Sequence, residues 1–320
     1  MTSEIMLATT LNAEKLTYPA EVTVKLDGVA ADFYKTPNGW VVQSRQGKPI
    51  LSVPHILRYL NTNFKSVADN FHIIGELTHV EYESFKDAGG IIRRKEENRG
   101  IQLNVYDVYR TDYPNDDFQI RKGYIKKFTE PKQGLFISKG SLNFRMIQAV
   151  PTLGTVKDGL ELSQKLVQVP EMMNESQRTE GLVIRSLRGS DSLYRVNKRS
   201  KGMMRYKPKP TLDLQVVSFE EATANKDMTF LDEPFHAGEG LRAVGRINVL
   251  YNGEETGVGP GCLTHRERRD LWDRYCLANK RMNGTLIAEV EFMLDASYDG
   301  LRQPVFKRWR TDKVEASYER

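Results

Sequence analysis

The chain is poor in the residues that build disulfide frameworks and zinc sites. Its 320 residues include two cysteines, Cys262 and Cys276, and five histidines that lack the spacing of metal ligands. We therefore expect neither a disulfide scaffold nor a zinc finger, and we interpret both cysteines as packing residues. Such a composition suits a reducing, cytoplasmic compartment.

Long apolar runs, internal repeats and low-complexity tracts are also missing. No stretch approaches the length needed to cross a membrane, and the N-terminal MTSEIMLATT lacks the pattern of a signal peptide. With 39% hydrophobic and 28% charged residues, the composition is that of an ordinary folded protein. A chain of this length fits two domains.

Acidic residues are slightly outnumbered, which gives a net charge of +5 from 47 basic and 42 acidic residues. The excess is concentrated between Arg185 and Lys209, where nine basic residues accompany a single acid, Asp191. Such a strip is either a solvated surface or a phosphate-binding surface. Charge alone leaves both interpretations open.

Short β-branched and aromatic runs predict strands at residues 22–25, 40–44, 73–77, 101–108 and 182–185. Apolar residues at helical spacing predict helices at 53–64 and 159–169. Strands and helices mixed in this way predict an α+β domain with antiparallel sheets.

The pattern changes around Pro208 and Pro210. Strand-like runs follow at 212–217, 241–251 and 285–292, and a capping box of Thr264 and Glu267 predicts one helix among them. Strands with a single helix in about 110 residues suit a β-barrel of the oligonucleotide-binding (OB) type. The predicted domains are therefore residues 1–210 and residues 211–320.

Seven short motifs follow one another between Thr23 and Lys313. They are K-L-D-G at 25–28, S-R-Q-G at 44–47, I-G-E-L at 74–77, N-V-Y-D-V at 104–108, E-G-L-V-I-R at 180–185, Y-K-P-K at 206–209 and L-R-Q-P-V-F-K-R-W-R-T-D-K at 301–313. A lone K-x-D-G occurs by chance in roughly one chain in ten of this length. The ordered set, however, resembles the covalent nucleotidyltransferase superfamily of ATP-dependent DNA ligases, RNA ligases and mRNA capping enzymes.

This resemblance implies an N-terminal nucleotidyltransferase (adenylation) domain followed by the OB-fold barrel, with Lys25 as the nucleophile. Lys25 would attack the α-phosphorus of ATP, form a lysyl-AMP phosphoramidate and release pyrophosphate. Because only a neutral amine attacks, burial or nearby cations must lower its pKa. Lys207 and Lys209 are the catalytic candidates for supplying such a field, although they could instead form a basic linker between the domains.

Two carboxylates are expected at the same site. By resemblance, Glu180 is the predicted ligand of Mg²⁺ or Mn²⁺, and Glu76 contacts either the metal or the ribose. Tyr106 occupies the position that stacks on adenine, although it could instead be a core tyrosine. The remaining nucleotide contacts expected in this domain come from Thr23, Arg45 and Arg185.

Residues 302–313 resemble the terminal motif of ATP-dependent DNA ligases. There Arg310, Asp312 and Lys313 would orient the β- and γ-phosphates so that pyrophosphate leaves in line with Lys25. The barrel would close over ATP and then turn away, with the Pro208–Pro210 region as the hinge. The alternative is a basic C-terminal strand without such a role.

The predicted function is that of a compact, monomeric, ATP-dependent DNA ligase of the viral or bacterial two-domain type. It would seal nicks in duplex DNA, in a bacterial cytoplasm or a virus-infected host cell. The basic strip predicts DNA contacts at Arg188, Lys198, Arg199 and Lys201. Further candidates for the DNA backbone are Arg93, Arg94, Lys126, Lys127 and an insertion at 220–239.

Two rival functions stay open. An RNA ligase or a capping enzyme would share the chemistry of Lys25, whereas a catalytically silent nucleic-acid-binding protein would never become labelled by ATP. One position departs from the superfamily, because Ala30 stands where an arginine is usual, five residues after the lysine. One anion contact is therefore missing or comes from elsewhere in the chain.

Overall fold

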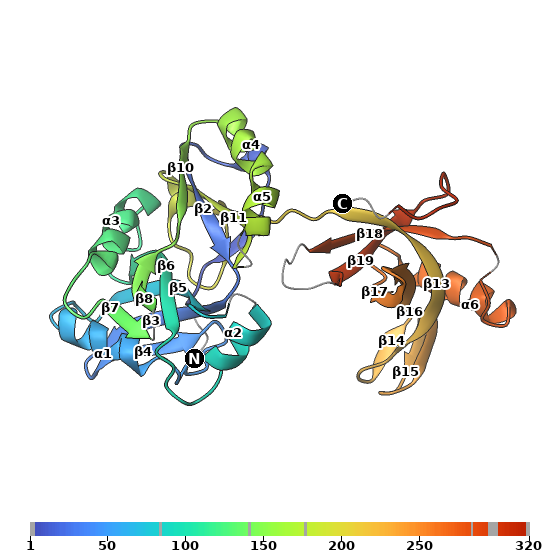
Figure 1. Ribbon diagram of the computed structural model, residues 1–320, viewed down its shortest axis with the longest axis horizontal. Helices are drawn as coiled ribbons and strands as arrows, with labels where there is room; N and C mark the ends of the chain where they lie inside the picture. The colour runs from blue at the N-terminus through green and yellow to red at the C-terminus, as the bar shows by residue number, and fades with distance from the viewer. Residues whose placement is uncertain are drawn as a thin grey trace. The chain divides into compact units, whose positions relative to one another are not determined.

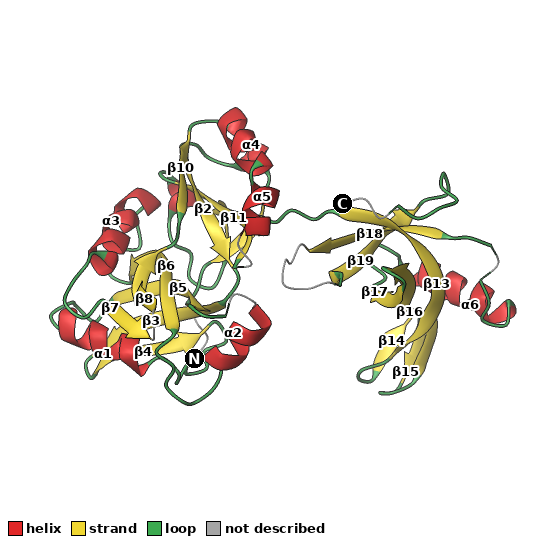
Figure 2. Ribbon diagram, viewed as in Figure 1, coloured by secondary structure: helices red, strands yellow, loops and turns green. Residues whose placement is uncertain are grey.

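The computed structural model describes residues 4–82, 85–139, 142–175, 178–282, 284–293 and 300–317. The chain divides into two compact units, Met1–Lys207 and Pro208–Arg320. Strands and helices alternate in the first unit, and strands dominate the second (Figures 1 and 2). The predicted α+β class is confirmed. Within the described ranges, no helix is both long and apolar enough to span a bilayer.

The first unit contains two five-stranded sheets, with the orders β1-β12-β11-β2-β10 and β4-β3-β5-β6-β9. The strands of the first sheet are β1 (Leu7–Thr10), β2 (Ala20–Leu26), β10 (Thr152–Val156), β11 (Thr179–Ser186) and β12 (Arg199–Tyr206). Those of the second are β3 (Val29–Thr36), β4 (Gly39–Ser44), β5 (Phe71–His79), β6 (Ile101–Arg110) and β9 (Ile147–Ala149). Because β2 and β3 belong to different sheets, the turn after Lys25 lies where the chain passes from one sheet to the other.

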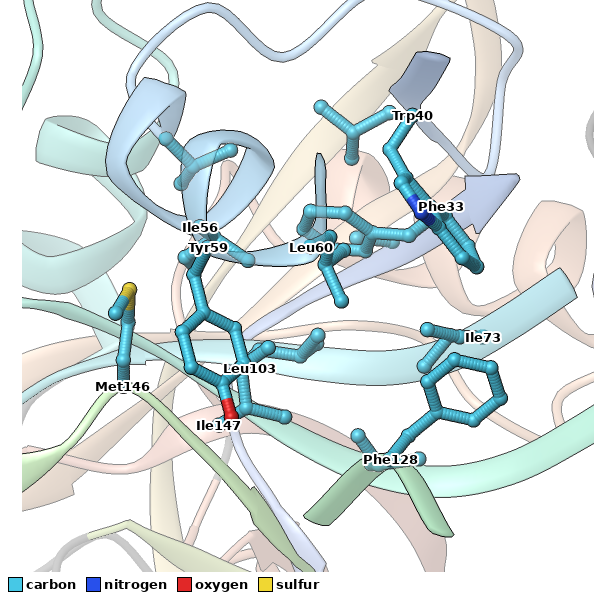
Figure 3. Packing of buried hydrophobic residues seen from close by; sticks show 14 of the residues in the cluster. Phe33, Trp40, Ile56, Tyr59, Leu60, Ile73, Leu103, Phe128, Met146 and Ile147 are labelled. Carbon is cyan, nitrogen blue, oxygen red and sulfur yellow. The ribbon is translucent and has the colours of Figure 1, made fainter. Parts of the chain in front are cut away.

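Helices α1 (Pro54–Asn63) and α3 (Phe118–Thr129) pack on the second sheet around a large apolar core (Figure 3). In this core the Phe128 ring lies 4.7 Å from that of Phe64, between ring centroids. Ile73 and Leu77 of β5 belong to this core, whereas Glu76 between them lines a cavity. Strand alternation thus presents one face of β5 to the core and the other to the site.

The remaining elements of the first unit are peripheral to the two sheets. They are the helices α2 (Phe85–Ile92), α4 (Gly159–Val167) and α5 (Val169–Glu175), the hairpin of β7 (Phe136–Lys139) and β8 (Leu142–Arg145), and the short 3₁₀ turns Ala13–Lys15 and Ser190–Ser192. The predicted helices at 53–64 and 159–169 are confirmed as α1 and α4, the latter ending two residues early. Asp158 caps the N-terminus of helix α4, because its carboxylate accepts from two backbone N–H groups of the first turn.

The second unit is a five-stranded sheet with the order β17-β16-β13-β18-β19. Its elements are β13 (Thr211–Thr223), β14 (Met228–Phe230), β15 (Glu233–Phe235), β16 (Gly240–Tyr251), β17 (Glu254–Val258), α6 (His265–Leu277), β18 (Ile287–Met293) and β19 (Arg302–Trp309). Gly259, just after β17, forms a parallel bridge with Val305 of β19, so the first and last strands meet and the sheet closes. This strand order, with one helix between the third and fourth barrel strands, is that of an OB-fold. The predicted capping box of Thr264 and Glu267 is confirmed at the start of α6.

The segment 220–239, expected to contact DNA, includes the β14–β15 hairpin. Phe230 of this hairpin is buried in a small core of its own with Leu241 and Ala243. The segment carries six acidic residues and one lysine, Lys226. This charge opposes contact with phosphates, so we assign it no role in DNA binding.

Asp107, directly after Tyr106 on β6, holds two buried arginines. Its Oδ1 lies 2.8 Å from Arg121 Nε, and its Oδ2 lies 3.4 Å from Arg185 Nη1. Arg121 also donates to the carbonyl oxygens of Asp116 and Ser192. The group fixes α3 and β11 to the strand that carries Tyr106.

Replacing Asp107 with asparagine is expected to lower the free energy of unfolding by about 3–5 kcal/mol, because two buried guanidinium groups would lose their counter-charge. Urea denaturation monitored by tryptophan fluorescence measures this loss. The matched control is Asp112→Asn, which removes the carboxylate of an exposed pair with Arg110 and should cost less than about 1 kcal/mol. Equal losses for the two variants would contradict the prediction.

Candidate active site

A cavity of about 800 Å³ lies in the first unit and is lined by residues of both sheets. This volume suits a ligand of nucleotide size. Ten lining side chains are cationic and two are acidic. They are Lys25, Arg45, Lys48, Arg93, Arg94, Lys95, Arg185, Arg199, Arg205 and Lys207, against Glu76 and Glu180. Such a wall attracts a polyanion.

Gly28 brings Lys25 and Glu76 to the same cavity. A Cβ atom at Gly28 would lie 2.3 Å from the carbonyl oxygen of Leu77 and 2.9 Å from Cγ of Glu76. Only glycine therefore lets the start of β3 approach β5 this closely. The K-L-D-G turn thus places the lysine at the end of one sheet beside the carboxylate of the other.

Glu180 reaches Lys25 because β11 has a bulge at this position. Thr179 pairs with Leu26 and Gly181 pairs with Lys25, which leaves Glu180 as the extra residue. Gly181 has φ +141°, and a Cβ there would lie 2.1 Å from the carbonyl oxygen of Tyr206. The bulge directs the carboxylate between two lysines. Its Oε1 lies 2.6 Å from Lys25 Nζ, and its Oε2 contacts Lys207 Nζ.

The surroundings of Lys25 in the cavity lower the pKa of its amine. Burial lowers the pKa of Lys25, Glu76 and Asp27 raise it, and Arg205 and Arg45 lower it further. The predicted lowering of this pKa is therefore present, with burial as its main cause. Burial also raises the pKa of Glu76 to about 7, so this carboxyl group changes charge near neutral pH.

Tyr106, Thr23 and Arg185 form a second part of the lining. Burial raises the pKa of Tyr106, so its phenol stays protonated at neutral pH. The Arg185 guanidinium lies 5.2 Å from the centroid of the Tyr106 ring and donates to the Tyr106 carbonyl oxygen. Thr23 donates its hydroxyl to the Val183 carbonyl oxygen at 3.2 Å. Because Arg185 is 3% exposed and engaged with protein groups, it supports Tyr106 more than it offers a free contact to a ligand.

Glu76 and Glu180 are the cavity residues that fit a divalent cation. Mg²⁺ in phosphoryl-transfer sites is usually held by one or two carboxylates, with substrate phosphates and water as its other ligands. In the described part of the chain no cluster of three or more His, Cys, Asp or Glu side chains that could hold a metal ion is found.

Lys209 and Lys207, predicted as a catalytic pair, belong to different units. Lys207 ends the first unit, whereas Lys209 lies in the second, with its Nζ 2.6 Å from Glu291 Oε1. This segment contributes a second cation to the cavity, Arg205, which was not among the predicted site residues. Arg205 and Lys207 are two residues apart at the end of β12. Because residues two apart in a strand face the same side, the position of Lys207 predicts that Arg205 faces the cavity as well.

The C-terminal residues Arg310, Asp312 and Lys313 come together in the second unit around Asp213 of β13. The Oδ2 atom of Asp213 lies 2.6 Å from Arg310 Nη1 and 2.5 Å from Lys313 Nζ. Asp312 binds Arg310 with both carboxylate oxygens, at 2.9 and 2.7 Å. These hydrogen bonds raise the pKa of Arg310 and lower that of Asp312. Asp213 was not among the predicted residues.

The four residues predicted to contact DNA are all exposed. Arg199 lines the cavity and donates to the Ala8 carbonyl oxygen at 2.8 Å, whereas Arg188, Lys198 and Lys201 are outside the lining. Of the further candidates, Arg93 and Arg94 line the cavity. Lys126 and Lys127 lie away from the cavity. Lys126 pairs with Glu130, and Lys127 lies over the Phe71 ring.

Arg205→Ala is expected to move the pH profile of lysine modification to higher pH. Arg205 disfavours the protonated amine of Lys25, so its removal raises the pKa of Lys25 and leaves less neutral amine at a given pH. Loss of this cation from the cavity lining should also slow the reaction at pH 7 by about tenfold. Rates of AMP attachment between pH 6 and 9 measure both effects. Arg205→Lys should restore the wild-type profile, and a shift to lower pH in the alanine variant would refute this role.

Residues 19–202 match the family described as RNA ligase, so the chain belongs to this family of nucleotidyltransferases. No curated protein matches the chain. The fold is shared with a structure designated Pmar-Lig_Pre, at 23% identity over 96% of this chain and 67% of that one, with a TM-score of 0.69. It is also shared with a Lig E DNA ligase, described as binding DNA with a minimal scaffold, at 16% identity over 97% and 100% of the two chains and a TM-score of 0.66. The ATP-dependent DNA ligase of bacteriophage T7, in complex with ATP, is more distant, at 16% identity over 96% and 98% and a TM-score of 0.51.

Proposed function

We propose that the protein is an ATP-dependent DNA ligase that seals nicks between a 5′-phosphate and a 3′-hydroxyl in duplex DNA. The observation that carries the proposal is the Lys25 amine, with its lowered pKa, 2.6 Å from Glu180 in a cavity of about 800 Å³. A buried lysine with a lowered pKa is a recognised covalent nucleophile. The cationic lining supports a nucleotide as the ligand.

The reaction has three phosphoryl transfers. Neutral Lys25 Nζ attacks the α-phosphorus of ATP, an N–P bond forms, and the bond to pyrophosphate breaks as the amine loses a proton. The 5′-phosphate of the nick then attacks the AMP phosphorus, which breaks the N–P bond and leaves a DNA-adenylate. Finally the 3′-hydroxyl attacks the 5′-phosphorus, the phosphodiester bond forms, and AMP departs.

Glu180 and Glu76 would hold Mg²⁺ or Mn²⁺, which neutralises charge on the phosphates when bound. Glu180 also keeps Lys25 and Lys207 together before ATP arrives, because its two oxygens contact both amines. Tyr106 offers its ring to adenine, with Arg185 and Asp107 holding it in place. Thr23 and Arg45 complete the nucleotide contacts of this unit.

We assign nucleotidyl transfer to the first unit, Met1–Lys207, and the OB-fold barrel to the second, Pro208–Arg320. The exposed Arg188, Lys198, Arg199 and Lys201 bind the backbone of nicked duplex DNA without reading its sequence, so binding should weaken steeply with salt. The enzyme is proposed to act as a monomer in the cytoplasm.

An RNA ligase is the second candidate, favoured by the family match over residues 19–202. The C-terminal segment 302–313 favours DNA, because RNA ligases generally lack its pattern. The two candidates share the lysine chemistry and differ in the strands that they join.

The deciding experiment labels the protein with ATP carrying ³²P at the α-phosphate and then adds unlabelled nicked substrates. A 36.7 kDa band should stay labelled on a denaturing gel, and GTP should compete poorly. Nicked DNA should discharge the label and be sealed at least about tenfold faster than a nick with RNA strands. Faster discharge by RNA would establish the second candidate, and a protein that never takes the label would exclude both.

A further inference from the structure

We propose that Glu4 is a positioning residue of the nucleotide cavity, because it holds residues 5–8 in place at the end of the cavity where Tyr106 lies. These four apolar residues all line the cavity and are named the apolar wall, whereas Glu4 is outside the lining. The inference rests on the proposed function and adds to it a residue that acts on ATP binding through the apolar wall, without touching ATP.

The backbone of the apolar wall is held by the first sheet and by one tyrosine beside it. Strand β1 pairs in parallel with β12 from Leu7 to Thr10. The Tyr194 hydroxyl, five residues before β12, accepts from Met6 N at 3.0 Å and donates to the Glu4 carbonyl oxygen at 3.1 Å. One hydroxyl therefore fixes two backbone groups of the segment that leads into β1.

The carboxylate of Glu4 is held by the second sheet. Its Oε2 accepts from the Tyr109 hydroxyl and lies 3.6 Å from His72 Nε2. His72 and Tyr109 face each other on the neighbouring strands β5 and β6. Burial raises the pKa of Tyr109, so its phenol stays protonated and remains a donor at neutral pH. Glu4 thus connects the two sheets whose residues line the cavity.

The groups that hold this carboxylate are themselves fixed. Asp32, which is fully buried, accepts from His72 Nδ1 at 2.9 Å and from Gln43 Nε2 at 3.0 Å. The Tyr109 ring stacks on those of His72 and Tyr194, with centroid distances of 4.7 and 3.9 Å. Because these rings and hydrogen bonds leave the donors little freedom, they determine where the Glu4 carboxylate lies.

The apolar wall supports the ring that is proposed to stack on adenine. Ile5 is 3% exposed and belongs to an apolar cluster with Tyr109, against which Tyr106 packs. If Glu4 no longer holds the apolar wall, Ile5 and the Tyr106 ring must be ordered when ATP binds, and this ordering costs binding free energy. The chemistry at Lys25 is unchanged once ATP is bound, so the loss should appear in the affinity for ATP.

The test compares Glu4→Ala with the matched control Glu14→Ala, which removes an exposed carboxylate ten residues further along, outside the cavity lining. In Glu4→Ala the ATP concentration for half-maximal AMP attachment should rise about tenfold, and the maximal rate should stay within about twofold of wild type. The control should keep both wild-type values. Removing a negative charge favours an anionic ligand, so weaker ATP binding reports the lost position of the wall and not the lost charge.

Two further measurements keep the inference open to refutation. Tyr109→Phe keeps the stacked ring and loses only the hydroxyl, so it should raise the half-maximal ATP concentration by about threefold. Without ATP, the backbone amides of Met6 and Leu7 should exchange hydrogen faster in Glu4→Ala than in wild type or Glu14→Ala.

An unchanged half-maximal ATP concentration in Glu4→Ala, a loss confined to the maximal rate, an equal effect in the control, or unchanged amide exchange would each overturn the inference. If wild type never takes AMP, the proposed function fails, whereas amide exchange still tests whether Glu4 holds the apolar wall.

Discussion

Lys25→Arg is expected to lose AMP attachment by roughly ten-thousandfold or more, because the nucleophile itself is removed. Arginine keeps the positive charge and can still pair with Glu180 across the short distance that Lys25 Nζ now spans. Its guanidinium stays protonated in proteins and therefore cannot attack phosphorus. Transfer of ³²P from α-labelled ATP to the chain, followed on a denaturing gel, measures the loss.

The same variant should retain the last step of the reaction. A nick supplied with AMP already on its 5′-phosphate needs no lysine nucleophile, so its sealing by Lys25→Arg should stay within about tenfold of wild type. Lys25→Ala should lose both the label and the contact with Glu180, and its sealing of this nick should be weaker than that of the arginine variant. Stable labelling of either variant would show that another residue is the nucleophile.

Much of the site was predictable because seven motifs in order resemble those of the nucleotidyltransferase superfamily. Lys25, Glu76, Tyr106, Glu180 and Lys207 all line one cavity. Alternation along β5 and the glycines at positions 28 and 181 explain how these side chains reach it. The motifs therefore supplied the residue types, whereas the direction of Glu180 depends on the bulge in the pairing of β11 with β2.

The parts that were missed depend on contacts between distant segments. Strand β1 pairs in parallel with β12, Leu7 facing Arg199, so that Ile5 to Ala8 become cavity residues. Asp213 joins Arg310 and Lys313 across about 100 residues of sequence. No local periodicity predicts such pairs.

The boundary between the units explains the outcome for Lys209. The sequence shows K-x-K as one motif, but the chain leaves the first unit between Lys207 and Pro208. Lys209 is consequently paired with Glu291 of the second unit, which also holds Lys307 at 2.9 Å. A motif that spans a domain boundary distributes its residues between two environments, which its spacing alone does not show.

The second large effect is expected from Arg310→Ala/Lys313→Ala, which should slow AMP attachment by about 10³-fold. We propose that these cations hold the β- and γ-phosphates while Lys25 attacks, so they stabilise charge only in the step that expels pyrophosphate. Around Asp213 they are held as a pair, 2.6 and 2.5 Å from one carboxylate oxygen. Sealing of a nick that already carries AMP should stay within a few-fold of wild type, because no pyrophosphate is formed there.

The matched control is Arg308→Ala, two residues before Arg310 on the same C-terminal segment. Arg308 is 67% exposed and pairs with Glu289, so the variant removes charge without touching Asp213. It should attach AMP at nearly the wild-type rate. If the double variant slows AMP attachment and sealing of the adenylated nick equally, the two cations serve DNA binding or folding instead. A loss confined to the first step is the result expected if the two cations contact the phosphates of ATP.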